Sequence, residues 1–109
     1  MEQIKIQGIS YRICVENNLI RDSGTQAEIN FVDRIIRIDS AVYGTDRGNI
    51  ALLHEVIHGI LEGLCFEEEN ENEHLIQCLA VSLYQIFRED IEKCIDQRLQ
   101  KSLENTKEK

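Results

Sequence analysis

The spacing of the apolar residues changes once along the chain, near residue 49, and this change constrains the fold more than any other feature. Before it, apolar and polar residues alternate through residues 4–15, a period of two that is typical of strands with one buried face. After it, Ile50, Leu53 and Ile57 recur three or four residues apart, which predicts a helix. We therefore expect an α+β fold in which strands come first and helices follow.

Each period predicts its own set of elements. The predicted strands cover residues 4–6, 9–15, 27–31 and 34–38. The predicted helices cover residues 47–62, 71–88 and 89–103. The inner side of the second helix is expected to carry Leu75, Ile76, Leu79, Leu83 and Phe87. Together they predict a small antiparallel sheet of three or four strands packed on the first helix, in one domain over residues 1–103 with a frayed tail over 104–109.

Composition argues against several classes of protein. A net charge of −8 argues against binding to a nucleic-acid backbone, which would need a basic surface. No apolar run approaches the roughly 18 residues that span a membrane, and the first residues lack the basic-then-apolar pattern of a signal peptide. The four cysteines form no CxxC pair and are expected to be reduced, mostly buried thiols. They are Cys14, Cys65, Cys78 and Cys94. We therefore expect a cytoplasmic protein that binds neither nucleic acid nor membrane.

Residues 54–58, with the sequence HEVIH, form an HExxH motif inside the first predicted helix. His54 and His58 lie one turn apart on a helix, so both imidazoles can bind one metal ion. Neutral imidazole is a good ligand for zinc. Glu55 is offset from the two histidines and can take a proton from a water molecule beside the metal without being a ligand itself. The motif therefore predicts a zinc site with Glu55 as general base.

A catalytic zinc ion usually has three protein ligands, so the motif needs one more. Steps of three and four residues along the second predicted helix connect Glu73 with Ile76 and Ala80, which places Glu73 at the start of an apolar stripe. A carboxylate aimed into a core is costly unless it meets a cation. We therefore rank Glu73 first, with His74 and then Glu69 as the alternatives.

Two helical segments, residues 52–61 (LLHEVIHGIL) and residues 72–80 (NEHLIQCLA), resemble the ImmA/IrrE-type metallopeptidases. The likeness covers residues 1–90 and is strongest to the short versions in phages and mobile elements, which are similar to minigluzincins. In that family a glutamate six residues before an apolar-Ala pair is the third ligand. Leu79-Ala80 is such a pair, so the resemblance also implies Glu73. It further implies an antiparallel sheet packed on the motif helix, with the ligand-bearing helix behind it.

Motif and resemblance together predict a zinc metallopeptidase that hydrolyses peptide bonds of a protein or peptide substrate. The strand at residues 34–38 is expected to be an edge strand that holds the substrate by strand addition. The alternative is an acidic binding module, in which zinc holds the fold and the negative surface engages a protein regulator. An intact Glu55 favours the enzyme, because a structural zinc site needs no general base. The sequence pattern gives no indication of the oligomeric state.

Overall fold

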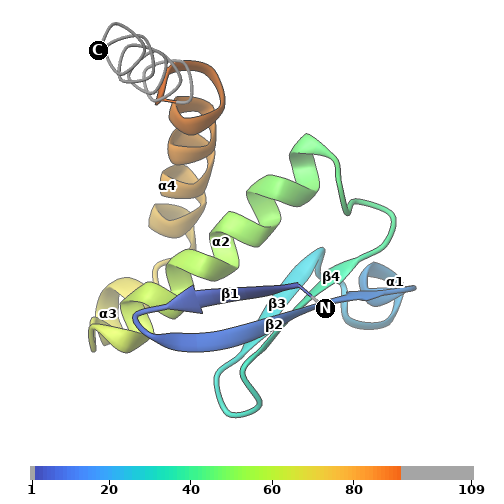
Figure 1. The fold of residues 1–109 in the computed structure, drawn as a ribbon, viewed down its shortest axis with the longest axis horizontal. Helices are drawn as coiled ribbons and strands as arrows, with labels where there is room; N and C mark the ends of the chain where they lie inside the picture. Colours follow the sequence, from blue (N-terminus) through green and yellow to red (C-terminus); the bar gives the residue numbers. More distant parts are fainter. Residues whose placement is uncertain (1, 92–109) are drawn as a thin grey trace, which may run out of the picture.

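The chain forms a small sheet from its first part and helices from its second part, as the change of period predicts (Figure 1). The computed structural model describes residues 2–91. The strands are β1 (Gln3–Ile6), β2 (Ile9–Glu16), β3 (Ala27–Asn30) and β4 (Ile35–Asp39). The helices are α1 (Leu19–Ser23), α2 (Asp46–Gly63), α3 (Glu67–Asn70), α4 (Glu73–Gln85) and the π-helical segment η1 (Ile86–Ile91). The predicted α+β class is confirmed, and no helix within residues 2–91 combines the length and apolar character needed to cross a membrane.

The sheet has the strand order β1-β2-β4-β3, so β1 and β3 are its edges. β1 pairs with β2 and β3 with β4 in antiparallel hairpins, but β2 and β4 run parallel, with Ile13 opposite Ile36. The expectation of a wholly antiparallel sheet is therefore wrong. A period of two reports which face of a strand is buried, and that face is the same for either direction of pairing. The expectation that residues 34–38 form an edge strand is also wrong, because β4 lies inside the sheet.

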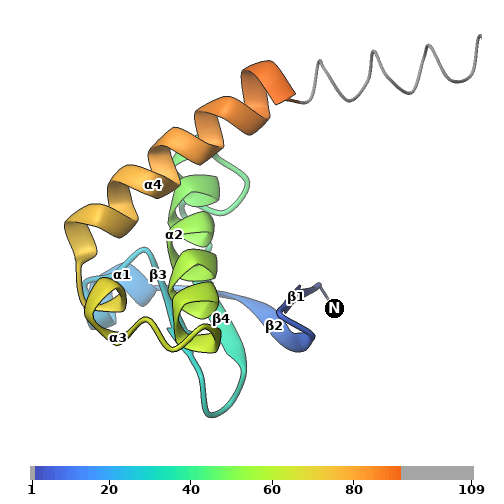
Figure 2. The ribbon, with the colours of Figure 1, turned by 90° about the vertical axis from the view of Figure 1, so that its left-hand side faces the viewer.

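Helix α2 lies between the sheet and α4 and packs on both (Figures 1 and 2). On the sheet side, Leu52 and Val56 pack on buried residues of three strands. These are Ile6, Tyr11 and Ile36. On the other side, Ile57 packs against Ile76 and Ala80 of α4, and all three are buried. The core therefore has two parts, and α2 contributes to each of them.

Helix α4 buries a narrower face than the sequence predicts. Ile76 is fully buried and Leu83 packs partly buried against the same cluster. The other predicted inner residues are exposed. They are Leu75 and Leu79 of α4 and Phe87 of η1, at 37%, 40% and 49% exposure. Among the residues described, α2 is the main neighbour of α4, and one helix covers only one side of another.

The cysteines also differ from expectation, although those that the structure describes are all free. Cys14 is half-buried, whereas Cys65 and Cys78 are exposed. Cys65 lies in the turn after α2, and Cys78 lies on a side of α4 that α2 leaves uncovered. Cys94 and most of the third predicted helix lie outside the described residues, as does the tail at 104–109.

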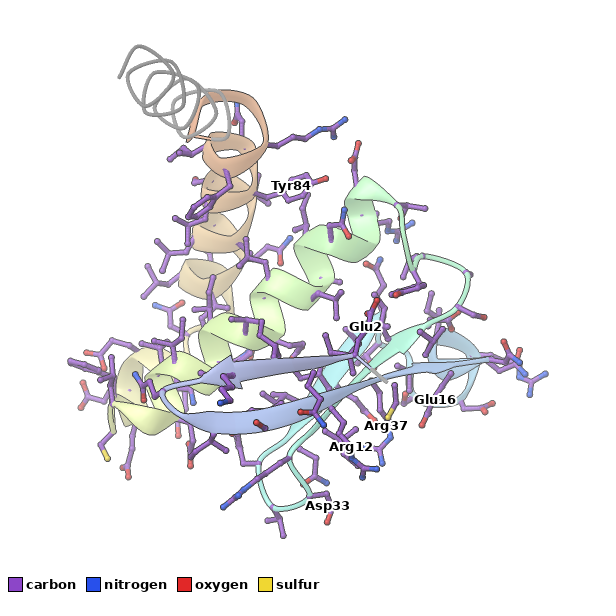
Figure 3. The ribbon with its side chains drawn as sticks, viewed as in Figure 1. Glu2, Arg12, Glu16, Asp33, Arg37 and Tyr84 are labelled. Atoms are coloured by element: carbon purple, nitrogen blue, oxygen red, sulfur yellow. The ribbon has the colours of Figure 1, made fainter. Side chains whose placement is uncertain are left out.

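A polar contact joins the first turn of α2 to the end of α4 (Figure 3). The Tyr84 hydroxyl donates to Oδ1 of Asp46 over 2.7 Å, and the Arg88 guanidinium forms an ion pair with the same carboxylate. The hydrogen bond and charge of Arg88 hold the pKa of Asp46 below its ordinary value, and the Tyr84 bond acts in the same direction. The Asp46 carboxylate is thus occupied by contacts that join α2 to α4 and η1.

Gly48 is required where α2 begins. Thr45 caps this end, since its Oγ1 accepts a hydrogen bond from the Gly48 backbone N–H over 3.1 Å. A Cβ atom at Gly48 would collide with the backbone carbonyl of Val42. We therefore predict that Gly48→Ala lowers the free energy of unfolding by about 1–3 kcal/mol, measured by urea denaturation. Gly63→Ala is the matched control, because a Cβ there meets only the Gln7 side chain, which is exposed and can move. Equal stabilities for the two variants would contradict the prediction.

Candidate metal centre

The HExxH motif lies on the strip of α2 that its two packed faces leave open. Leu52 and Val56 turn toward the sheet, and Leu53 and Ile57 turn toward α4. Each residue turns an α-helix by about 100°, so residues 54 and 58 lie past the side that carries residues 53 and 57, where neither the sheet nor α4 covers α2. The imidazoles of His54 and His58 are only 15% and 13% exposed, and their ring centroids lie 5.0 Å apart.

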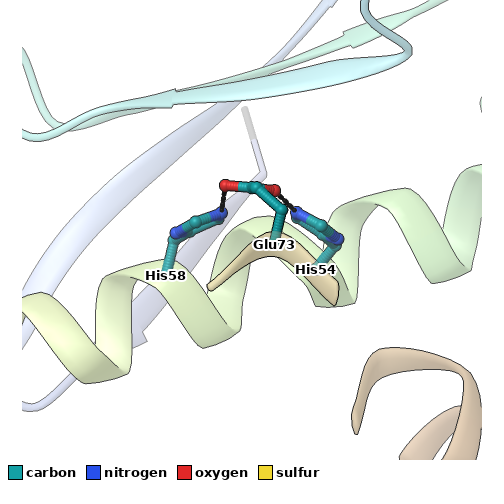
Figure 4. A group of neighbouring side chains, drawn as sticks. All are labelled: His54, His58 and Glu73. Carbon is teal, nitrogen blue, oxygen red and sulfur yellow. Dashed lines mark hydrogen bonds and ion pairs between the residues drawn. The ribbon is translucent and has the colours of Figure 1, made fainter. Parts of the chain in front are cut away.

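Glu73, the first residue of α4, brings its carboxylate between the two imidazoles (Figure 4). Its Oε2 lies 2.8 Å from Nε2 of His54, and its Oε1 lies 2.9 Å from Nε2 of His58. The ligand atoms of these three residues all lie within 4.8 Å of one another. The structure therefore contains a His-His-Glu group whose donor atoms are close enough to share one metal ion.

The two alternatives for the third ligand lie outside this group. The His74 ring faces Cys78 on its own helix, with Nε2 3.7 Å from Sγ, and Glu69 is exposed on α3. Glu73 itself differs from expectation in one respect. Its side chain is 66% exposed, so it lies at the mouth of the site and not in the core. The apolar stripe that predicted its direction begins one turn later, at Ile76.

Two amide side chains that the sequence analysis missed orient the imidazoles. Oε1 of Gln77 lies 2.7 Å from Nδ1 of His54, and Oδ1 of Asn70 lies 2.7 Å from Nδ1 of His58. Gln77 is one turn after Glu73 and Asn70 is three residues before it, so both lie on the segment that carries the carboxylate. For Gln77 the spacing from Glu73 was an available signal, because residues four apart share a helix face, whereas Asn70 lies on the separate helix α3.

These hydrogen bonds determine the chemistry that the two rings present. An amide oxygen only accepts hydrogen bonds, so with the oxygens of Gln77 and Asn70 assigned toward the rings, each Nδ1 carries a proton. In neutral rings of this tautomer each Nε2 atom directs its lone pair at an oxygen of the Glu73 carboxylate. The nitrogen and the oxygen are then both acceptors, and at 2.8 Å for His54 and 2.9 Å for His58 they repel each other. A shared cation, or protonation of the rings, removes that repulsion. The donor set therefore fits a metal ion, and its outer hydrogen bonds are those of metal-binding histidines.

Glu55 lies beside this group without joining it. It is half-buried and lines the same cavity as His54 and Glu73. Burial raises the pKa of Glu55 to about 7, although the charges of His58 and His54 act in the opposite direction. A carboxylate whose pKa is near neutral is well matched to proton transfer. A metal cation beside it would lower this pKa again.

The cavity at the site has a volume of about 630 Å³ and runs along the open strip of α2. One wall is formed by Thr25, Gln26 and Ala27, where the chain enters β3. Opposite them lie Glu73 and Gln77 of α4. Within residues 2–91 no strand pairs with the outer edge of β3, and the first residue of β3, Ala27, lines the cavity. The site is therefore a groove between a sheet edge and a helix.

No protein-family model, curated protein or solved structure matches the chain. The function is therefore inferred from the geometry of the site.

We predict that Gln77→Ala and Asn70→Ala each weaken Zn²⁺ binding by about 10- to 100-fold, because each leaves a ligand imidazole free to rotate. Competition with a chromogenic chelator measures the affinity. Gln85→Ala, at the other end of the same helix, removes the same side chain outside the site and should leave the affinity unchanged. Equal affinities for all three variants would mean that the amides do not orient the rings.

Proposed function

We propose that this protein is a zinc-dependent metallopeptidase of the gluzincin type, in which His54, His58 and Glu73 hold the zinc ion and Glu55 is the general base. One observation carries the proposal. Two imidazoles, each hydrogen-bonded to an amide oxygen at Nδ1, direct Nε2 at a single carboxylate, and a half-buried glutamate lies beside them. The resemblance to ImmA/IrrE-type metallopeptidases points to the same reaction.

The donor set supports zinc and a catalytic site. Two imidazole nitrogens with one carboxylate is the ligand set of many zinc peptidases, which keep a fourth position open, whereas structural zinc sites are closed by four protein ligands. Zinc, when bound, activates a water molecule and polarises the carbonyl group of the peptide bond. The 66% exposure of Glu73 and the adjoining cavity leave room for a substrate on the open side.

The protein's own residues would then move the protons. The Glu55 carboxylate takes a proton from the attacking water while the oxygen of that water bonds to the carbonyl carbon of the substrate. When the carbon–nitrogen bond breaks, Glu55 delivers that proton to the leaving amine. Its half-buried position limits competition from bulk water.

The edge of β3 is the best candidate for holding the peptide. An extended peptide can add to a sheet edge through backbone hydrogen bonds, and β3 is the edge strand that borders the cavity. This replaces our expectation for residues 34–38, because β4 already pairs with a strand on each side. A substrate lying along β3 would pass over the strip of α2 that carries His54 and Glu55.

We infer that the protein works in the cytoplasm. The three cysteines that the structure describes are free, and two of them are exposed, a state that a reducing compartment maintains.

Metal content tests the ligand assignment. We predict about one zinc ion per chain for the wild type after reconstitution, measured by elemental analysis, because the three-ligand set is one that binds zinc. Glu73→Ala should lose most of the zinc, since it removes the carboxylate between the two imidazoles. His74→Ala is the matched control, because it alters the neighbouring residue and should keep the zinc. A wild type that binds no zinc would refute the proposal. Zinc retained in Glu73→Ala would mean that a residue other than Glu73 is the third ligand.

Glu55→Gln separates the enzyme from an acidic binding module that uses zinc only to hold its fold. We predict that this variant keeps its zinc, because Glu55 is not in the ligand group. Hydrolysis of denatured casein, followed by the release of soluble peptides, should fall at least about 100-fold. Undiminished cleavage would exclude Glu55 as the base, and a zinc-loaded wild type that cleaves nothing would favour the binding module.

A further inference from the structure

The groove extends beyond the metal ligands toward the start of α2, where Arg47 lines it. Arg47 and His54 lie seven residues apart on α2, close to two turns, so they share one side of the helix. The rise of an α-helix separates them by about 10 Å along its axis. Arg47 is the only lysine or arginine among the residues that line the groove.

Gln26 holds the Arg47 side chain in place. With its amide oxygen turned toward the guanidinium, Gln26 accepts hydrogen bonds from Nε and Nη2 of Arg47, each 2.5 Å long. Gln26 is itself fixed, because its backbone carbonyl accepts the N–H of Asp39 over 2.9 Å. A guanidinium has five N–H donors, so this contact orients Arg47 and leaves three of them available.

The charge of Arg47 is not neutralised by a neighbour in the described part of the chain. No carboxylate among residues 2–88 lies within 4.0 Å of its guanidinium. The adjacent Asp46 is already bonded to Tyr84 and Arg88.

We propose that Arg47, oriented by Gln26, binds a carboxylate of the peptide substrate close to the bond that is cleaved. Arginine suits this role because its planar fork of donors matches a carboxylate. An extended peptide advances about 3.3 Å per residue, so 10 Å corresponds to a position within about three residues of the scissile bond. The carboxylate belongs either to an Asp or Glu side chain or to the C-terminus of the substrate. This inference rests on the proposed function in taking a peptide as the ligand.

Peptide capture tests the subsite without relying on cleavage. Zinc-loaded Glu55→Gln protein is immobilised and exposed to two pools of short randomised peptides, one with amidated and one with free C-termini, and the bound peptides are sequenced. If the source is a side chain, Asp and Glu are enriched about three- to tenfold in the amidated pool, the size of effect expected for one partly exposed charge-assisted pair. If the source is the C-terminus, the free pool is preferred by a similar factor.

The enrichment should depend on Arg47. Adding Arg47→Gln should abolish it, and adding Arg47→Glu should reverse it in favour of Lys and Arg. Arg12→Gln is the matched control, since Arg12 is exposed on β2, on the side of the sheet away from α2 (Figure 3), and should leave the enrichment intact. Circular dichroism and zinc content establish that each variant is folded. No carboxylate preference in either pool, or a preference that survives Arg47→Gln, would overturn the proposal.

Cleavage of the same pools by zinc-loaded protein with Glu55 intact keeps the two proposals distinguishable. Arg47-dependent capture without any cleavage would reject the peptidase and leave the carboxylate subsite standing. Cleavage without an Arg47-dependent preference for Asp, Glu or a free C-terminus would leave the peptidase standing and reject the subsite.

Discussion

The burial of α2 between the sheet and α4 is the constraint on which the site depends. Leu52 and Val56 pack on the strands, while Ile57 packs on the second helix. A helix enclosed on two sides keeps only one strip open, and the remaining side chains of that strip must face a common groove. His54 and His58 are on it, and their direction therefore follows from the packing of their apolar neighbours.

The two glutamates of the site differ because their surroundings differ. Glu73 is two-thirds exposed and its carboxylate lies between two imidazoles, where a shared cation would compensate its negative charge. Glu55 is half-buried and meets no such partner, and burial dominates its proton affinity. A carboxylate of the first kind is suited to holding a cation, and one of the second kind to exchanging a proton. Helix α2 provides Glu55 and α4 provides the carboxylate between the rings, so the site forms only when α4 packs on α2.

The sequence predicted the features that local spacing controls. The period of α2 and the motif within it gave the relation of His54 to His58, and the apolar stripe of α4 indicated Glu73. Strand direction was not predictable, because the same faces of β2 and β4 are buried whether the two strands run parallel or antiparallel. The exposure of Leu79 depends on how much of α4 a single neighbouring helix covers, which is a property of tertiary packing. Gln77 was missed for another reason, since its role depends on the rotation of an imidazole on a different helix.

Both imidazoles come from α2 and the carboxylate comes from α4. A cation that binds all three side chains therefore makes the docking of α4 depend on the metal concentration. Residues 70–77 carry Glu73 and both orienting amides, so displacing this one segment would remove them together. Linkage then requires that a metal which binds only the docked state stabilises it by about 2.7 kcal/mol at a hundred times its dissociation constant. A chain of 109 residues has a small core, so this amount is a large share of its total stability. The availability of such a metal would therefore set the fraction of molecules with an assembled groove.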